Sequence, residues 1–309
     1  MGICDFRLHL SKAWIASPKR LAKAGVPESE RRYARKQDLA LELEERSRAR
    51  GLRYAWVGFD AAYGADQKLC NRLEDAGETY VGDVTVSQRV WTVRPAFSFP
   101  KPGMGRPRKK PVLDPACEGM RRRVGELEDE RFESECEMLV YREGAKGKLR
   151  CRAWKLKVWT WGGDDQASRE RVLIVSEDMD GERKLSLGNC IEVEDTSRLV
   201  YMQRQRFWIE HAFGQAKGEL GIGQYQVRKW QGWHHHMALV CMACLFSLKE
   251  QLLAESELPL LSVRDIVELL EHYLPRKGRT EQEVFEAMRQ RHKRRQKDID
   301  RHRLRQPPS

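Results

Sequence analysis

The sequence "LRYAWVGFDAAYGADQKLCNRLEDAGETYVGDV", residues 52–84, carries alternating strand and helix signals. Residues 52–60 predict a strand that ends in Asp60, and the "AAYGAD" segment that follows predicts a turn. The segment "DQKLCNRLEDAG" predicts a helix closed by Gly77. Residues 79–84 then predict a second short strand.

The residues before this stretch extend the same alternation of elements. "CDFRLHL", residues 4–10, alternates apolar and polar side chains and predicts a half-buried strand. "RKQDLALELEERSRARG" predicts a helix that ends at Gly51. Strands and helices therefore alternate, and this order predicts an α/β fold with a partly parallel sheet.

The remainder of the chain changes character twice. Residues 97–115 are rich in Pro, Gly, Lys and Arg and predict an extended basic loop. The densely charged residues 120–135 predict a helix, and the segments after them read as strands. From about residue 196 the pattern is helical, with one helix expected over roughly 196–218 and another over roughly 232–255. The predicted domains are an N-terminal part of the core (1–84), a β-rich insertion (85–185), a C-terminal part of the core (186–255) and a helical basic tail (256–309).

The bulk properties indicate a partner and a compartment. The chain has 309 residues, a net charge of +11 and an isoelectric point near 9.3, which favours a polyanionic partner, most simply nucleic acid, without excluding an anionic membrane surface. The longest apolar run, residues 237–246, is too short to span a bilayer, and the N-terminus lacks a signal sequence. Eight scattered cysteines indicate reduced thiols. We expect a soluble, cytoplasmic protein.

Asp60 is the first candidate site residue. Ligands and metal ions gather at the carboxyl ends of strands in open α/β sheets, where Asp60 is expected. The alternative is that Asp60 caps the turn or the next helix, and the residue taken alone favours this structural interpretation.

Three further candidates lie on one predicted helix, "RFWIEHAFGQAKGELG", residues 206–221. With Arg206 at zero on a helical wheel, Glu210 falls at about 40° and Lys217 at about 20°, beside an apolar stripe. Glu210 could act as a metal ligand or general base while Arg206 and Lys217 bind phosphate oxygens. The alternative is an ordinary i,i+4 pair between Arg206 and Glu210, worth about 0.2–0.5 kcal/mol.

Taken together, these motifs resemble the insertion-sequence transposases of the DDE superfamily. The resemblance rests on "WVGFDAAYGAD", then a β-rich insertion, then "RFWIEHAFGQAKGELGIGQYQVRKWQGWHHHMAL", with "DFRLHL", "AGVPES" and "SVRDIVELLEHYLPRKGRT" in the expected order. It implies a ribonuclease H-like core. Asp60 matches the second catalytic Asp and Glu210 the catalytic Glu, while Arg206, Glu210 and Lys217 keep the spacing of the family's Y-x2-R-x3-E-x6-K signature. Gln203 occupies the position of the signature Tyr, so that contact is expected to be weakened.

The resemblance also implies a chemistry. Members of the family use two divalent ions, Mg²⁺ or Mn²⁺, for DNA cleavage and strand transfer, with Asp60 and Glu210 as metal ligands here. They act on transposon ends and target DNA, usually as homodimers. The first catalytic Asp and the first strands of the fold have no counterpart in this sequence, so we expect an N-terminally truncated core with impaired catalysis. The alternatives are a non-catalytic fragment that binds DNA or inhibits a transposase, and a decayed relic.

Overall fold

A computed structural model describes residues 2–98, 111–144, 147–162, 167–226, 228–274 and 280–303. The chain forms two compact units, Met1–Leu248 and Lys249–Ser309. Most of the predicted basic loop, residues 99–110, lies outside the described residues.

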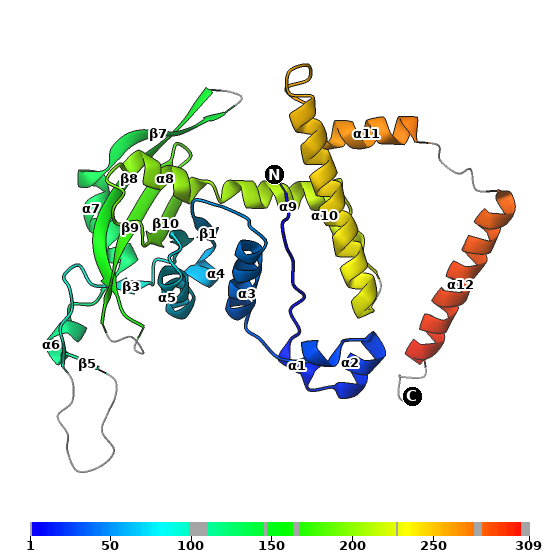
Figure 1. The fold of residues 1–309 in the computed structure, drawn as a ribbon, viewed down its shortest axis with the longest axis horizontal. Helices are drawn as coiled ribbons and strands as arrows, with labels where there is room; N and C mark the ends of the chain where they lie inside the picture. Colours follow the sequence, from blue (N-terminus) through cyan, green and yellow to red (C-terminus); the bar gives the residue numbers. More distant parts are fainter. Residues whose placement is uncertain are drawn as a thin grey trace, which may run out of the picture. The chain divides into compact units, whose positions relative to one another are not determined.

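The first unit contains a six-stranded sheet (Figure 1). Its order is β1 (Val57–Phe59), β2 (Tyr80–Asp83), β10 (Arg183–Gly188), β9 (Arg169–Asp178), β8 (Gly147–Thr160) and β7 (Glu137–Gly144). β1 and β2 are parallel, and every other neighbouring pair is antiparallel. Two short pairs are β3 (Arg89–Val90) with β6 (Arg122–Arg123), and β4 (Phe97–Ser98) with β5 (Val112–Leu113). This mixed α/β architecture agrees with the expected ribonuclease H-like class.

The helices fall before, between and after these strands. In the first part of the chain they are α1 (Lys12–Ile15), α2 (Pro18–Ala24), α3 (Lys36–Ala49), α4 (Ala61–Gly64), α5 (Gln67–Asp75), α6 (Pro115–Glu118) and α7 (Val124–Glu135). The later helices are α8 (Thr196–Arg204), α9 (Phe207–Gly218), α10 (Trp230–Leu253), α11 (Val263–Tyr273) and α12 (Glu281–Arg303). Short 3-10 turns occur at Glu28–Glu30 and Ile222–Gln224.

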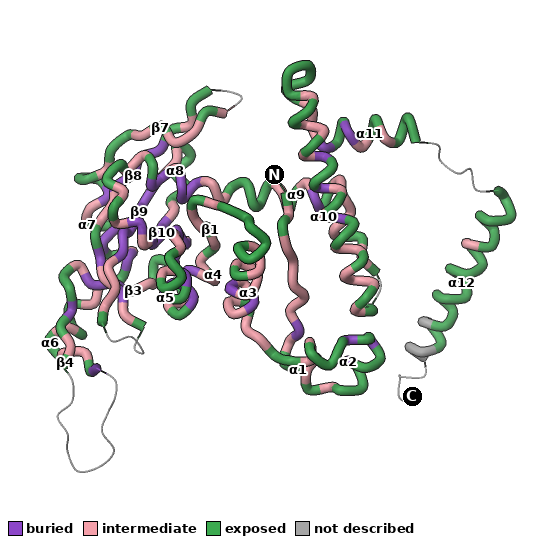
Figure 2. Tube along the Cα trace, viewed as in Figure 1, coloured by how far each residue is buried: buried purple, intermediate pink, exposed green. Residues whose placement is uncertain are grey.

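Both faces of the sheet are buried, which explains the continuous apolar run in β9. Leu173 and Val175 of β9 pack into one core with Phe132 of α7. Ile174, between them, packs into a second core with Leu199 of α8. Successive side chains of a strand point to opposite faces, so one strand serves both cores. Figure 2 shows the buried residues concentrated in β8, β9 and α8.

Local signals in the sequence predicted several boundaries well. Gly51 and Gly77 adopt positive φ angles of 83° and 79°, directly after α3 and after the end of α5. A residue with a Cβ atom is strained there, so glycine is the natural terminator. Asp66 caps α5 by accepting a hydrogen bond from the N–H of Leu69 at 3.0 Å.

The strand predicted at residues 4–10 is wrong. This segment is extended but forms no strand, because no neighbouring strand pairs with it among the described residues. Side chains hold it instead: Arg46 of α3 donates to both carboxylate oxygens of Asp5, and the ring of Phe6 packs edge-on against Trp233 of α10. Alternation predicts an extended amphipathic chain, but a strand also requires a partner.

Two further expectations need correction. The strand predicted at 52–60 is confined to Val57–Phe59. The single helix predicted over 196–218 is divided into α8 and α9, with a turn at Gln205 and Arg206. The apolar stripe of α9 is only partly covered, since Ala216 is buried but Phe213 is 46% exposed.

Helix α10 is longer than the apolar run that marks it in the sequence. Its 24 residues are apolar enough to cross a membrane by length and composition alone. A core helix of a soluble protein meets the same criteria, so this observation is weak evidence for a membrane segment.

Candidate functional site

Asp60 lies at the carboxyl end of β1, where the chain turns into α4. Its Oδ1 atom accepts hydrogen bonds from the backbone N–H groups of Ala62 at 3.0 Å and Tyr63 at 3.3 Å. The capping role that the sequence left open is therefore present. The carboxylate also lines a pocket of about 470 Å³, so capping does not withdraw it from the surface.

Two glycines allow the elements of this pocket to approach each other. A Cβ atom on Gly64 of α4 would lie 2.0 Å from the carbonyl oxygen of Asp83. A Cβ atom on Gly82 of β2 would lie 2.0 Å from the ring of Phe59 in β1. Gly64 thus lets α4 pack directly on the end of β2, and Gly82 makes room for the Phe59 ring of β1 against β2.

Arg206 connects the sheet to α9. Its Nε atom lies 2.7 Å from Oδ2 of Asp83, and its Nη2 atom lies 2.8 Å from Oε1 of Glu210. The contact with Asp83 is an ion pair without hydrogen-bond alignment, since the Nε–H group has no hydrogen-bond acceptor. The i,i+4 pair that the sequence offered as an alternative is therefore formed, but Arg206 also reaches a carboxylate on the sheet.

The pocket brings together part of the predicted site. Asp60, Asp83 and Arg206 line it, together with residues from the start of β10. Glu210 is not among the lining residues and joins the cluster only through Arg206; its side chain is 64% exposed. Lys217 lies in the last turn of α9, exposed and outside the pocket, where a cation interacts favourably with the helix dipole.

Asp83 is the residue that sequence reasoning missed. It was read only as part of a short strand, yet it ends β2 beside the end of β1, which carries Asp60. Burial raises the pKa of the Asp83 carboxyl, against the opposing effects of a hydrogen bond from Ser186 and the charges of Arg206 and Lys184. The sequence did hold a signal, because parallel strands end at the same edge of a sheet, and Asp60 directly follows β1 while Asp83 is the last residue of β2.

Gln203, at the position of the signature Tyr, is buried in α8. Its Oε1 atom accepts a hydrogen bond from Ser176 Oγ at 2.6 Å, and its Nε2 atom lies 2.9 Å from Ser186 Oγ. Nε2 also lies 3.2 Å from the carbonyl oxygens of Ile174 and Lys184. Gln203 therefore fastens α8 to β9 and β10, directly before the turn that carries Arg206.

The carboxylates at the candidate site have the right chemistry to bind a divalent ion, but too few of them are grouped together. Asp60, Asp83 and Glu210 offer the hard carboxylate oxygens that Mg²⁺ and Mn²⁺ prefer. Among the described residues, however, no three Asp, Glu, His or Cys side chains are grouped closely enough to hold one ion. The described part of the chain therefore does not supply all the ligands of the two-metal site that the resemblance implies.

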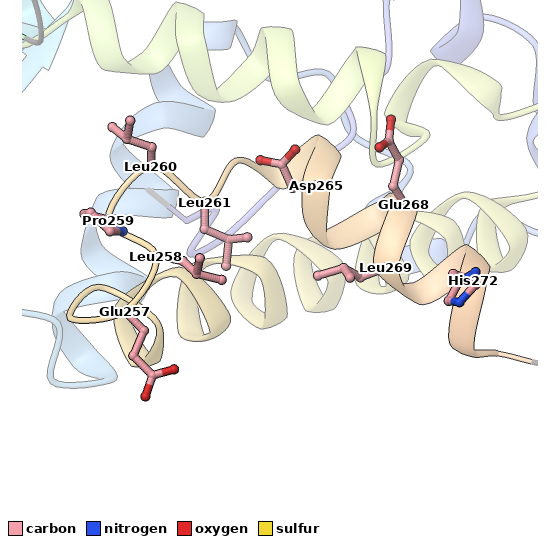
Figure 3. Close-up of a pocket in the computed structure, with 9 residues that line it drawn as sticks. All are labelled: Glu257, Leu258, Pro259, Leu260, Leu261, Asp265, Glu268, Leu269 and His272. Carbon is pink, nitrogen blue, oxygen red and sulfur yellow. The ribbon is translucent and has the colours of Figure 1, made fainter.

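Another pocket, of about 650 Å³, lies within the second unit (Figure 3). Leucines from the loop before α11 and from α11 itself line it, with Asp265, Glu268 and His272 around them. None of the predicted site residues contributes to this pocket.

The comparison with known families agrees with the fold. Residues 3–132 match the family described as DDE superfamily endonuclease. The match covers less than half of the chain and, together with the fold, supports a DDE-family, transposase-like protein. No curated protein matches the chain. The matched segment includes Asp60 and Asp83 but ends before Arg206, and the match tests none of the roles expected for Asp60, Arg206, Glu210 and Lys217.

Proposed function

We propose that this protein is an insertion-sequence transposase that cleaves DNA at transposon ends and transfers the strands to target DNA. One observation carries the proposal: Arg206 lines the pocket of Asp60 and pairs with Glu210, although Asp60 and Glu210 are far apart in the sequence. The sheet end and α9 therefore present an acidic and cationic cluster of the kind that phosphoryl transfer requires.

DNA is the proposed partner. Arg206 and Lys217 bind phosphate oxygens in this proposal, Arg206 at the pocket and Lys217 further along α9. The net charge of +11 supports attraction to a polyanion. We further propose that the protein works in the cytoplasm as a homodimer on DNA.

Asp60 and Glu210 are the proposed ligands of Mg²⁺ or Mn²⁺. Asp60 and Glu210 would hold such ions, whose chemistry would be activation of the attacking hydroxyl and stabilisation of the leaving oxygen in an in-line displacement. Asp60 is held at the strand end by its bonds to the α4 backbone, and Glu210, which is largely exposed, pairs with Arg206. Because the described residues do not group three ligands, we expect cleavage by this chain alone to be weak.

Nicking of supercoiled plasmid DNA by the purified chain, with Mg²⁺ or Mn²⁺, tests the catalytic proposal. We expect slow, metal-dependent nicking that is lost in Asp60→Asn and Glu210→Gln. Glu219→Gln, which removes a carboxylate from the end of the same helix, is the matched control and should nick like the wild type. Nicking that is absent, or equal in all four proteins, would refute catalysis by this chain.

A second candidate function is non-catalytic DNA binding, which would inhibit a complete transposase. The remaining alternative is a decayed relic without activity. Non-catalytic binding is favoured by the existing engagements of the two carboxylates, since Asp60 caps α4 and Glu210 pairs with Arg206. This function predicts DNA affinity that falls steeply with salt and needs no metal. Binding without any metal-dependent nicking would select it over catalysis, and affinity that does not change with salt would exclude it.

A further inference from the structure

Asp83 is fixed more firmly than a surface carboxylate. Only 18% of its side chain is exposed, and Ser186 of β10 donates a hydrogen bond to its Oδ1 atom at 2.8 Å. The close packing of Gly64 against its carbonyl oxygen fixes its backbone as well. The remaining oxygen, Oδ2, points to Arg206.

Arg206 needs such a partner because its backbone does not fix its side chain. It occupies the turn between α8 and α9 and forms no side-chain capping bond. Its guanidinium group is planar, so contacts at Nε with Asp83 and at Nη2 with Glu210 determine where the third nitrogen, Nη1, points. Glu210 is largely exposed and weakly restrained, which leaves Asp83 as the firmer of the two anchors.

We propose that Asp83 is a positioning residue for Arg206. Asp83 holds the Arg206 guanidinium at the pocket of Asp60, so that Nη1 of Arg206 can bind a DNA phosphate. The inference deepens the proposed function and rests on it. Asp83 itself does not contact the DNA in this account. Its contribution is to remove the conformational freedom that Arg206 would otherwise lose on binding.

Positioning and simple electrostatics predict opposite changes in DNA affinity when the Asp83 carboxylate is neutralised. An anionic side chain close to bound phosphate repels it, so neutralising a carboxylate there should strengthen DNA binding. If Asp83 positions Arg206, neutralising it should weaken DNA binding instead. The two accounts are therefore separated by the direction of one measured change.

The experiment measures binding of the full chain to a fluorescent duplex DNA of random sequence over a series of KCl concentrations. Arg206→Gln should lower the affinity and reduce the salt slope by about one phosphate contact. Asp83→Asn should weaken binding about three- to tenfold, and the double variant should bind no more weakly than Arg206→Gln alone. Ser186→Ala, which frees the Asp83 carboxylate, should weaken binding in the same direction by a smaller factor.

Two controls separate positioning from changes in charge or folding. Glu170→Gln removes a carboxylate that pairs with Lys157 on the sheet surface and should leave binding unchanged or slightly tighter. Asp83→Glu keeps the charge and should recover part of the lost affinity. If Asp83→Asn misfolds, Ser186→Ala carries the test, because it leaves the charge of Asp83 in place. Ser186 also bonds Gln203, so Ser176→Ala, which removes another hydrogen bond of Gln203, is its control and should leave binding unchanged.

The outcomes distinguish this inference from the proposed function. If Arg206→Gln weakens binding but Asp83→Asn leaves it equal or tighter, positioning by Asp83 is wrong and the phosphate role of Arg206 stands. Losses that simply add in the double variant also overturn positioning. If Arg206→Gln has no effect, the DNA role of Arg206 fails, and the inference fails with it.

Discussion

The backbone of Asp83 approaches Gly64 so closely that a Cβ atom at residue 64 would lie 2.0 Å from the Asp83 carbonyl oxygen. This contact packs the first turn after β1 against the end of β2. It places Asp60 and Asp83 on one pocket, so a backbone requirement at a single glycine underlies the geometry of the candidate site.

Gly64→Ala should therefore destabilise the protein by about 1–3 kcal/mol, because overpacking against backbone cannot be relieved by a side-chain rotation. Gly214→Ala in α9 is the matched control. Nothing lies within 4 Å of its ideal Cβ position, so alanine should stabilise that helix by up to about 1 kcal/mol. Urea unfolding measures both changes. A Gly64→Ala variant as stable as the wild type would show that the packing of α4 on β2 is wrong.

The ion pair between α5 and β9 predicts an acid-sensitive stability. Arg171 is 1% exposed and donates to both carboxylate oxygens of Glu74, at 2.7 and 3.1 Å. Burial alone would raise the pKa of Glu74, but hydrogen bonds from Arg171 and Arg169 hold it below its ordinary value of 4.5. The stability that depends on this carboxylate is therefore complete above about pH 4.5 and lost as the pH falls through the lower, folded-state value.

Glu74→Gln should lower the free energy of unfolding at pH 7 by about 2–4 kcal/mol, because it leaves the charge of Arg171 buried without its partner. The variant should also lose part of the decline in stability between neutral and acid pH. Glu268→Gln, in the exposed pair with Arg264, should change stability by less than about 0.5 kcal/mol. Equal acid sensitivity in Glu74→Gln and the wild type would contradict the ion-pair account.

Gln203 should resist replacement by the tyrosine that the signature predicts. The side chain is 3% exposed and bonded to both β9 and β10, so Gln203→Tyr would overpack the interface and leave Ser176 and Ser186 without this partner. We expect a loss of about 2–4 kcal/mol in unfolding free energy and no gain in DNA affinity. Gln226→Ala, at an exposed position, should be neutral. A Gln203→Tyr variant with improved stability would contradict the buried network.

Much of the chain between residues 35 and 84 could be predicted from sequence because its signals are local. Gly51 and Gly77 follow helix ends, and Asp66 caps a helix, whatever the rest of the chain does. The strand predicted at residues 4–10 could not be excluded from sequence, because strand formation requires a second segment to pair with and local signals do not reveal one.

The candidate site was predictable only in part, for the same reason. Asp60 and Glu210 follow from motif and spacing, but the importance of Asp83 depends on the parallel register of β1 and β2 and on its distance to Arg206. Nor does the sequence reveal that β10, β9, β8 and β7 continue the sheet of β1 and β2. The predicted boundaries between the core and the insertion remain predictions.

In the proposed function, Asp60 and Glu210 act at one metal site on DNA. Electron paramagnetic resonance of Mn²⁺ binding to the full chain, with duplex DNA present, tests it without requiring turnover. We predict that Asp60→Asn and Glu210→Gln each weaken Mn²⁺ binding about tenfold or more, while Glu219→Gln leaves it unchanged. Mn²⁺ binding that is unaffected by both Asp60→Asn and Glu210→Gln would contradict the claim.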